Sequence, residues 1–310
     1  MDNESRMYEL EFPAPQLSSA DGAGPVLIHG LEGFTDAGHA VRLATTHLRE
    51  SLETELVASF DVDELLDYRS RRPLMTFKSD HFSDYTEPEL NLWAVKDTAG
   101  TPFLLLSGLE PDLRWERFVT AVRLLAEQLG VRRTIGLSAI PMAIPHTRPL
   151  GLTAHGSDPE LIGDHQRWPG ELQIPGSASA LLEYRMAQHN HESVGFSVHV
   201  PHYLAQTAYP EAAQTLLENV AENAGLELSL AALGEAAARV REQVDEHISG
   251  NAEVETVVQA LERQYDNFVT AQERQSSLLA GDGELPTGEE LGAEFERFLA
   301  GLDGTDDPAS

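Results

Sequence analysis

Residues 25–48 read PVLIHGLEGFTDAGHAVRLATTHL, and this stretch decides the fold. Its opening apolar run, residues 26–28, predicts a buried strand. The chain then turns at Gly30 and Gly33, and from about Asp36 the spacing of apolar residues predicts an amphipathic helix. A strand that leads straight into a helix is typical of an α/β fold, whose ligands bind in the crevice beyond the carboxyl ends of the strands.

The turn itself does not resemble a phosphate-binding loop. It carries Glu32 and Asp36 where such a loop presents backbone amides, and its glycines match neither the dinucleotide fingerprint nor the P-loop. Two interpretations stay open. Either the carboxylates line the crevice and bind a cation, an amine or a partner's basic side chain, or the turn is structural and Asp36 caps the helix that follows.

The rest of the chain continues this alternation of strands and helices. We expect an edge strand at residues 8–12, further strands at 55–60, 134–140 and 194–200, an antiparallel hairpin at 90–95 and 103–106, and a long helix at 112–129. This order predicts an α/β fold with a mostly parallel twisted sheet and helices on both of its faces.

The second half of the chain has a different character. Residues 141–175 are rich in Pro and Gly without a clear period, which favours a lid or an intersubunit clasp. Later, helical spacing on both sides of residues 249–251 predicts a C-terminal α-helical hairpin, followed by a short helix through Leu299. We therefore expect an α/β core domain at 1–225, a helical appendage at 226–300 and a disordered tail at 301–310.

Composition limits the class of protein. The 310 residues include no cysteine, which excludes disulfides, thiolate metal sites and a cysteine nucleophile. The formal net charge of -30 argues against nucleic acid and against a membrane surface, since both recruit basic faces. Without a long apolar stretch or a signal-like start, we expect a soluble cytoplasmic protein. The acidic bias fits either a GC-rich genome or a salt-adapted cytoplasm.

An acidic and basic run follows the strand expected at residues 55–60. Asp61, Asp63 and Asp67 could together bind a hard cation, because such ions take several carboxylates. Their spacing does not match a calcium loop, however, and nearby arginines can neutralise them. We therefore predict an intramolecular salt-bridge network at the edge of the sheet, or an intersubunit contact, and no metal.

Four histidines lie close together in the sequence, at positions 189, 191, 199 and 202. They suggest zinc, but Pro201 disturbs the second pair and no H-E-x-x-H motif occurs. His199 and His202 could instead line the crevice as acid/base groups, or serve the structure alone. Ser138 lies in GLSAI, which lacks the second glycine of a nucleophile elbow, so no enzyme signature emerges.

Six segments together carry a family resemblance: GLEGFTDAGHA, ELVASFDVDELLDYRSRRP, PFLLLSGLEPDLRWERF, TIGLSAIPMAIPHTRP, PGSASALLEYRMAQ and VGFSVHVPHYLAQTAYPEAA. In number and order they resemble the proteasome assembly chaperone 2 family, most closely its actinobacterial branch. The resemblance covers residues 8–224. It implies an α/β core similar in topology to nucleoside phosphorylases and related hydrolases, and it implies oligomers. For eukaryotic and archaeal relatives it implies a chaperone role in placing proteasome subunits.

The resemblance brings no catalytic residues with it. The sequence also ends in GTDDPAS, without the hydrophobic-Tyr-X anchor of such chaperones, which weakens the expectation of direct docking on a proteasome ring.

Two functions follow from these observations. The first is an oligomeric, non-catalytic assembly chaperone or scaffold, which binds itself and proteasome subunits or another protein client without a cofactor. The alternative is an enzyme or small-molecule binder that uses the crevice. In that case several candidate residues would converge there, namely Glu32, Asp36, Asp61, Ser138, His146, His199 and His202.

Overall fold

The computed structural model describes residues 7–11, 17, 22, 24–163, 165 and 170–279, with side chains up to residue 271. The chain divides into two compact units, Met1–Glu262 and Arg263–Ser310. The helix expected through Leu299 and the tail expected at 301–310 lie outside the described residues. Among the residues that are described, no helix is both long and apolar enough to cross a membrane.

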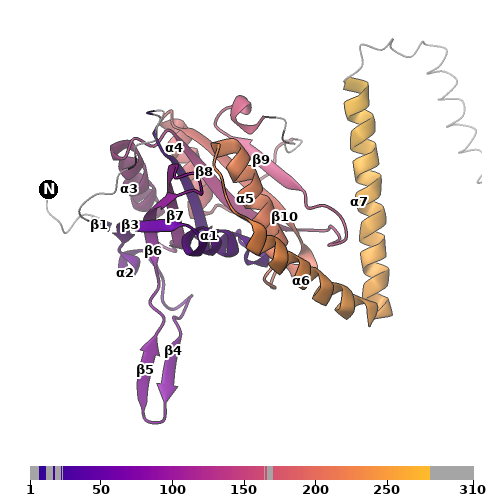
Figure 1. Cartoon of the computed structure of the whole chain (residues 1–310), viewed down its shortest axis with the longest axis horizontal. Coiled ribbons are helices and arrows are strands. Elements are labelled where there is room, and N and C mark those ends of the chain that lie inside the picture. The colour runs from indigo at the N-terminus through magenta and orange to yellow at the C-terminus, as the bar shows by residue number, and fades with distance from the viewer. Residues whose placement is uncertain are drawn as a thin grey trace, which may run out of the picture. The chain divides into compact units, whose positions relative to one another are not determined.

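An eight-stranded mixed sheet forms the centre of the first unit (Figure 1). Its order is β1 (Tyr8–Leu10), β3 (Glu53–Phe60), β6 (Leu90–Lys96), β7 (Pro102–Leu109), β2 (Val26–Glu32), β8 (Arg133–Met142), β10 (Glu192–Pro201) and β9 (Leu152–Gly156). Strands β3, β7, β2, β8 and β10 run in one direction, and β1, β6 and β9 run in the other. The predicted mostly parallel sheet is confirmed, including its antiparallel β6–β7 hairpin and the edge strand β1.

Helices cover both faces of the sheet, as predicted. Helices α1 (Ala40–Ser51) and α5 (Pro210–Ala224) pack on one face, and α3 (Trp115–Gln128) and α4 (Ala178–Gln188) on the other. Because side chains alternate along a strand, β2 contributes to both cores. Ile28 belongs to the core under α1 and α5, and Leu27 to the core under α3 and α4.

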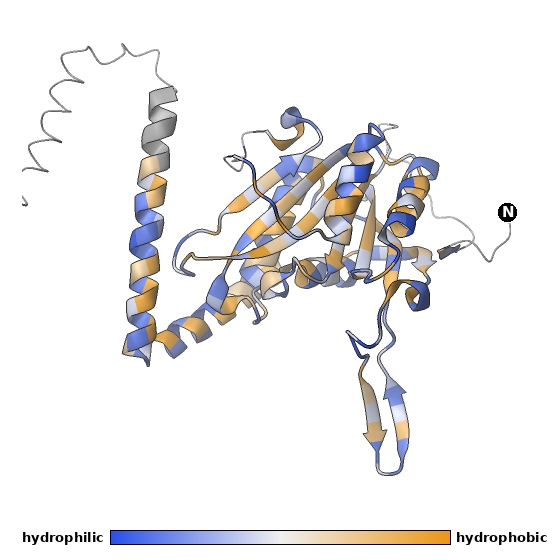
Figure 2. Ribbon diagram, turned by 180° about the vertical axis from the view of Figure 1, so that it is seen from behind, coloured by the Kyte–Doolittle hydropathy of each residue, from blue (hydrophilic) through white to orange (hydrophobic). Residues whose placement is uncertain are grey.

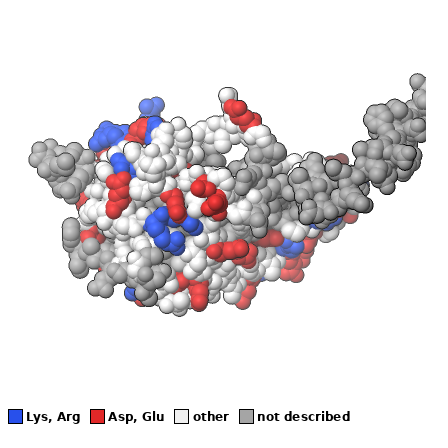
Figure 3. Space-filling model, turned by 90° about the horizontal axis from the view of Figure 1, so that it is seen from above, with Lys and Arg blue, Asp and Glu red and all other residues white. Residues whose placement is uncertain are grey.

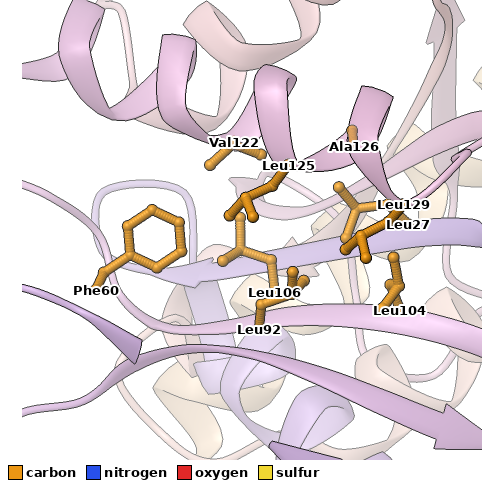
Figure 4. A pocket seen from close by; sticks show the side chains of 9 residues that line it. All are labelled: Leu27, Phe60, Leu92, Leu104, Leu106, Val122, Leu125, Ala126 and Leu129. Carbon is orange, nitrogen blue, oxygen red and sulfur yellow. The ribbon is translucent and has the colours of Figure 1, made fainter. Parts of the chain in front are cut away.

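The core beneath α3 is tightly packed. Figure 4 shows the apolar side chains that α3 and the strands point toward one another, including Phe60, Leu106 and Leu125. They leave no space for a water molecule between them. This layer is therefore structural and holds no ligand cavity.

Two consecutive helices follow the sheet, in agreement with the predicted helical spacing. They are α6 (Ala231–Ser249) and α7 (Ala252–Leu279). Helix α6 packs against α5, and its Leu233 is buried in the core. Between the two helices, the side chain of Asn251 accepts hydrogen bonds from the first backbone N–H groups of α7, which explains why the helical pattern breaks there.

Residues 141–175 are not uniformly irregular, so that prediction is wrong for part of the segment. Strand β9 pairs antiparallel with β10, with His155 opposite Gly195, and a 3-10 helix, η3 (Pro159–Ile162), follows. The sequence LTAHG is short and half polar, and its partner strand lies about 40 residues away along the chain, so no local pattern reveals it.

A second, two-stranded sheet was also not expected. Strands β4 (Met75–Lys78) and β5 (His81–Tyr85) form an antiparallel hairpin. Figure 1 shows this hairpin extending away from the main sheet, and Figure 2 shows hydrophobic residues along it. Every residue of both strands is exposed.

Candidate functional site: a crevice at the strand ends

An open crevice of about 650 Å³ lies at the carboxyl ends of the central strands. Parallel pairing places Glu32, the last residue of β2, beside Leu109, the last residue of β7. The turns that leave these two strands therefore form facing walls. Beside apolar residues, the lining includes the acids Glu32, Asp36, Glu110 and Asp112 and the bases His39, Arg42 and Arg71.

The turn after β2 is held by a buried carboxylate. Glu110 accepts hydrogen bonds from the backbone N–H of Phe34, at 3.0 Å, and from that of Ala178 in the first turn of α4, at 2.7 Å. A Cβ on Gly33 would lie 2.1 Å from the Glu110 carboxylate. Glycine is therefore required at position 33, and the wall of the crevice is fixed to α4.

Asp36 has a structural role as well as a place in the crevice. Its carboxylate accepts a hydrogen bond from the backbone N–H of Val41, at 2.7 Å, and so caps the start of α1. Gly38 follows at φ 67°, packed on Tyr209. Asp36 therefore binds an N–H in the first turn of α1 although His39 holds the N-cap position, and the same side chain also lines the crevice.

The two acids of the turn have unusual protonation behaviour. Burial, together with the negative charge of Glu32, raises the pKa of Asp36 to about 7, although the hydrogen bond from the Val41 N–H opposes the shift. Burial also raises the pKa of Glu32, against the opposing charges of Arg42, Arg49 and Arg71. The crevice therefore changes charge near neutral pH.

Arg71 joins the two walls. Its guanidinium donates to the carboxylate of Asp112 at 2.6 Å, to the carbonyl oxygen of Glu110 at 2.7 Å and to that of Glu32 at 3.2 Å. A planar guanidinium with several donors suits this multiple contact. The arginine therefore sets the width of the crevice as well as part of its charge.

The acidic and basic run after β3 makes intramolecular contacts, but among the described residues its three aspartates do not form ion pairs with the nearby arginines as predicted. Glu64 pairs with Arg114, and the hydroxyl of Tyr68 donates to Asp63 at 2.5 Å. Asp61 caps the short helix α2 (Val62–Leu65) by accepting from backbone N–H groups. Within the part of the chain that the structure describes, no group of three His, Asp or Glu side chains is arranged to hold a metal ion.

Ser138, His199 and His202 lie outside the crevice lining. Ser138 is inside β8 rather than at a sharp turn, and its hydroxyl lies 2.6 Å from that of Ser197 on β10. His199 bonds to the Thr153 hydroxyl at 2.8 Å. His202 is exposed in the 3-10 helix η4 (His202–Leu204).

His146 is buried between the core and α6. Its Nδ1 lies 2.7 Å from the hydroxyl oxygen of Tyr203, and its Nε2 lies 3.0 Å from a carboxylate oxygen of Asp245. The Tyr203 oxygen also accepts the backbone N–H of His146, at 2.8 Å, so its own proton is available for Nδ1. Nε2 then carries the ring proton and donates it to Asp245, which attaches α6 to the loop after β8.

A second polar cluster, beneath α4, gave no signal in the sequence. Buried His29 on β2 contacts the Ser179 hydroxyl at 3.0 Å, and Glu183 pairs with His155 at 2.6 Å. The absence of a Cβ at Gly136 makes room for both Glu183 and His29. Burial lowers the pKa of His29, whereas for His155 burial is outweighed by Glu183, which raises its pKa. Only the packing of α4 brings these residues together.

The crevice lining combines carboxylates, basic groups and aromatic rings. Of the seven candidates, the structure brings only Glu32 and Asp36 together there. No Ser, Thr, Lys or Tyr is among its described lining residues, whereas carboxylates and one imidazole are. Phe34 and Trp115 add aromatic surface to an acidic lining, a combination that suits a cationic group. Arg71, Glu110 and Asp112 also line the crevice. Glu110 and Asp112 follow the end of β7, which was the available sequence signal for them, whereas Arg71 lies beyond α2 and gave no such signal.

Comparisons with known proteins give a consistent result. The family model described as PAC2 family matches residues 30–248. A crystal structure of a Mycobacterium tuberculosis protein of unknown function is 68% identical to this chain, with a TM-score of 0.85, and the match covers 87% of this chain and 92% of that one. A protein of unknown function from Corynebacterium glutamicum is 44% identical, with a TM-score of 0.82, and the match covers 85% of this chain and 98% of that one.

A more distant structural neighbour has a functional name. A Mycobacterium tuberculosis proteasome-assembly chaperone homologue is 23% identical, with a TM-score of 0.69, over 75% of this chain and 99% of that one. At this identity the likeness shows the fold alone. No curated protein matches the chain.

Proposed function

Since the chain belongs to the PAC2 family, we propose that it acts by binding other proteins, as an oligomeric assembly chaperone or scaffold. The observation that carries the proposal is the exposed β4–β5 hairpin. Phe77 and Phe82 on this hairpin are 59% and 64% exposed. Solvent-exposed apolar groups of this kind mark contact sites for other proteins.

Proteasome subunits are the client class that we propose. The support is the family membership together with the names of structural neighbours, a proteasome-assembly chaperone homologue and an archaeal proteasome activator from Pyrococcus furiosus.

A reconstitution with purified components tests this function. Proteasome α- and β-type subunits from the same organism are mixed with and without the chain, and ring formation is followed by native gel electrophoresis. We expect the chain to comigrate with subunit intermediates and to change the rate at which rings form. Identical time courses, with the chain migrating by itself, would contradict the proposal.

The crevice supports a second function, the binding of a small cationic ligand. The specific observation is a cavity of about 650 Å³ that holds Asp36, whose pKa is raised to about 7. Perturbed acids in a strand-end cavity are typical of ligand sites. Calorimetry with a panel of small amines and guanidines tests it, and binding should weaken in the Glu32→Gln variant. If no compound of the panel gives a heat larger than its heat of dilution, this function is excluded.

A further inference from the structure

The charged groups that line the crevice divide into those that the fold itself uses and those that it leaves free. Glu110 accepts two backbone N–H groups, and Asp112 accepts hydrogen bonds from Arg71 and from the backbone N–H of Asp67. Both carboxylates and the guanidinium of Arg71 therefore hold the walls of the crevice together. A ligand has to bind the charges that remain.

Glu32 and Arg42 remain free, with opposite charges. Both line the crevice. Among the residues that the structure describes, none forms a hydrogen bond or an ion pair with the carboxylate of Glu32 or with the guanidinium of Arg42. Burial raises the pKa of Glu32 and of Asp36, and the positive charge of Arg42 opposes the rise in both. The guanidinium therefore lies near both carboxylates without pairing with either.

Elsewhere in the chain, basic side chains have acidic partners. Arg123, Arg133 and Arg185 each form an ion pair, and on the face drawn in Figure 3 basic side chains gather in small groups with acidic ones beside them. Charges that are partly buried without a partner cost free energy. A ligand that carries both opposite charges would remove this cost for Glu32 and Arg42 together.

Aromatic rings stand beside these charges on both walls of the crevice. On the wall after β7, the indole N–H of Trp115 donates to the carbonyl oxygen of Pro111 at 2.6 Å, which fixes the ring in place. On the wall after β2, the side chain of Phe34 is 67% exposed. Two rings on facing walls offer a contact surface to an apolar group that lies between them.

The size and the charges of the crevice together limit the class of ligand. Its volume of about 650 Å³ is that of a site for a small molecule, which typically has roughly 300 to 1,000 Å³. A simple amine would pair with Glu32 but would bring a second positive charge near Arg42. An α-amino acid instead carries an ammonium group, a carboxylate and a side chain on one carbon, so that each feature of the crevice has a counterpart.

We propose that the crevice binds a free α-amino acid with a large apolar side chain. The ammonium group pairs with Glu32 and the carboxylate pairs with Arg42. The apolar side chain lies between Phe34 and Trp115. The inference rests on the second proposed function, because it names the ligand class of the same crevice, and it makes that ligand a zwitterion rather than a simple cation.

Isothermal titration calorimetry at neutral pH with three matched probes tests the ligand class. L-phenylalanine carries both charges, L-phenylalaninamide lacks the carboxylate, and N-acetyl-L-phenylalanine lacks the ammonium group. Since each charge forms a charge-assisted pair, we expect L-phenylalanine to bind at least about tenfold more tightly than either of the other two. Equal affinities for the three probes, or no binding of L-phenylalanine, would overturn the inference.

Two substitutions test which residue binds which charge. In Arg42→Gln, the affinity for L-phenylalanine should fall to about that for the amide, and binding of the amide should not weaken. In Glu32→Gln, the affinity for L-phenylalanine should fall to about that for the N-acetyl compound. The matched control is Arg239→Gln, at an exposed arginine of α6 that has no ion pair in the described part of the chain. A loss of the same size in this control would attribute the effect to net charge and would contradict the assignment.

The probes also separate this inference from the proposed functions. Binding of simple amines and of L-phenylalaninamide, without a preference for L-phenylalanine, would retain the second function and overturn the inference. If no probe binds but the chain still forms complexes with proteasome subunits, the inference and the second function both fail and the assembly role stands.

Discussion

Asp36 gives the sharpest prediction about the stability of this protein. Its carboxyl group lies at the entrance to α1, where burial raises its pKa to about 7, and it still accepts the Val41 N–H. The variant Asp36→Asn keeps an oxygen acceptor for that N–H and cannot ionise. We therefore expect it to be more stable than the wild type at neutral and alkaline pH.

The size of the effect follows from linkage between protonation and folding. In the unfolded chain Asp36 ionises near its ordinary pKa of about 4, whereas in the folded chain it holds its proton up to about pH 7. Wild-type stability consequently falls as the pH rises from about 4 to about 7 and changes little from this group above that range. Between about pH 5 and about pH 8 the free energy of unfolding of the wild type falls by about 2 to 3 kcal/mol through this group, at about 1.36 kcal/mol for each pKa unit.

Urea denaturation at about pH 5 and about pH 8 measures this difference. The free energy of unfolding of Asp36→Asn minus that of the wild type should be larger at the higher pH by about 2 to 3 kcal/mol. Asp36→Ala is the companion variant, because it also removes the charge but loses the cap, at a cost of about 1 kcal/mol at both pH values. An advantage that is the same at both pH values would refute the reasoning.

Three further substitutions test contacts elsewhere in the molecule. Glu110→Gln places an amide NH₂ against one of two backbone N–H donors, and denaturation should show that the free energy of unfolding falls by about 1 to 3 kcal/mol. An unchanged midpoint would mean that the buried carboxylate does not hold the turn. Asp245→Ala leaves Nε2 of His146 without its acceptor, so amide exchange should accelerate in α6 and not in β2, and a uniform acceleration would contradict this local role. Gly136→Ala puts a methyl group 2.1 Å from the Glu183 carboxylate, so the free energy of unfolding should fall by about 1 to 3 kcal/mol. An unchanged free energy of unfolding would show that α4 can move aside.

Much of the central sheet could be predicted from the sequence because its signals are local. The run at 26–28 indicates β2 and Gly33 indicates its turn, whereas Gly30, which was also expected in the turn, lies inside the strand. The stripe on residues 112–129 indicates α3. The order of the strands could not be predicted, since β2 pairs with β7 and β8, which lie far along the chain. Strand β9 was missed because it is short and half polar, although its Ala154 packs in the core. The β4–β5 hairpin was missed because its residues are exposed and do not meet the core of their own chain.

Part of the candidate site could be predicted because its signal, like that of the sheet, is local in the sequence. Glu32 and Asp36 stand in the turn that the sequence marks as a strand end. Arg71 reaches the crevice only through the path that the chain takes around α2, which local spacing does not encode. Nε2 of the His146 ring forms its hydrogen bond with Asp245, about 100 residues away along the chain. The role of His146 therefore depends on where α6 packs, which the sequence does not show.

The most direct test of the proposed function is native mass spectrometry of the purified chain, alone and after mixing with purified proteasome subunits. The chain has a mass of 33.9 kDa, and in the first sample we predict a homo-oligomer, at a whole-number multiple of this mass, as the main species. In the second, we predict new species whose masses combine this chain with subunits in fixed ratio. A mixture in which the chain and the subunits retain the masses that they have separately would contradict a role in assembly.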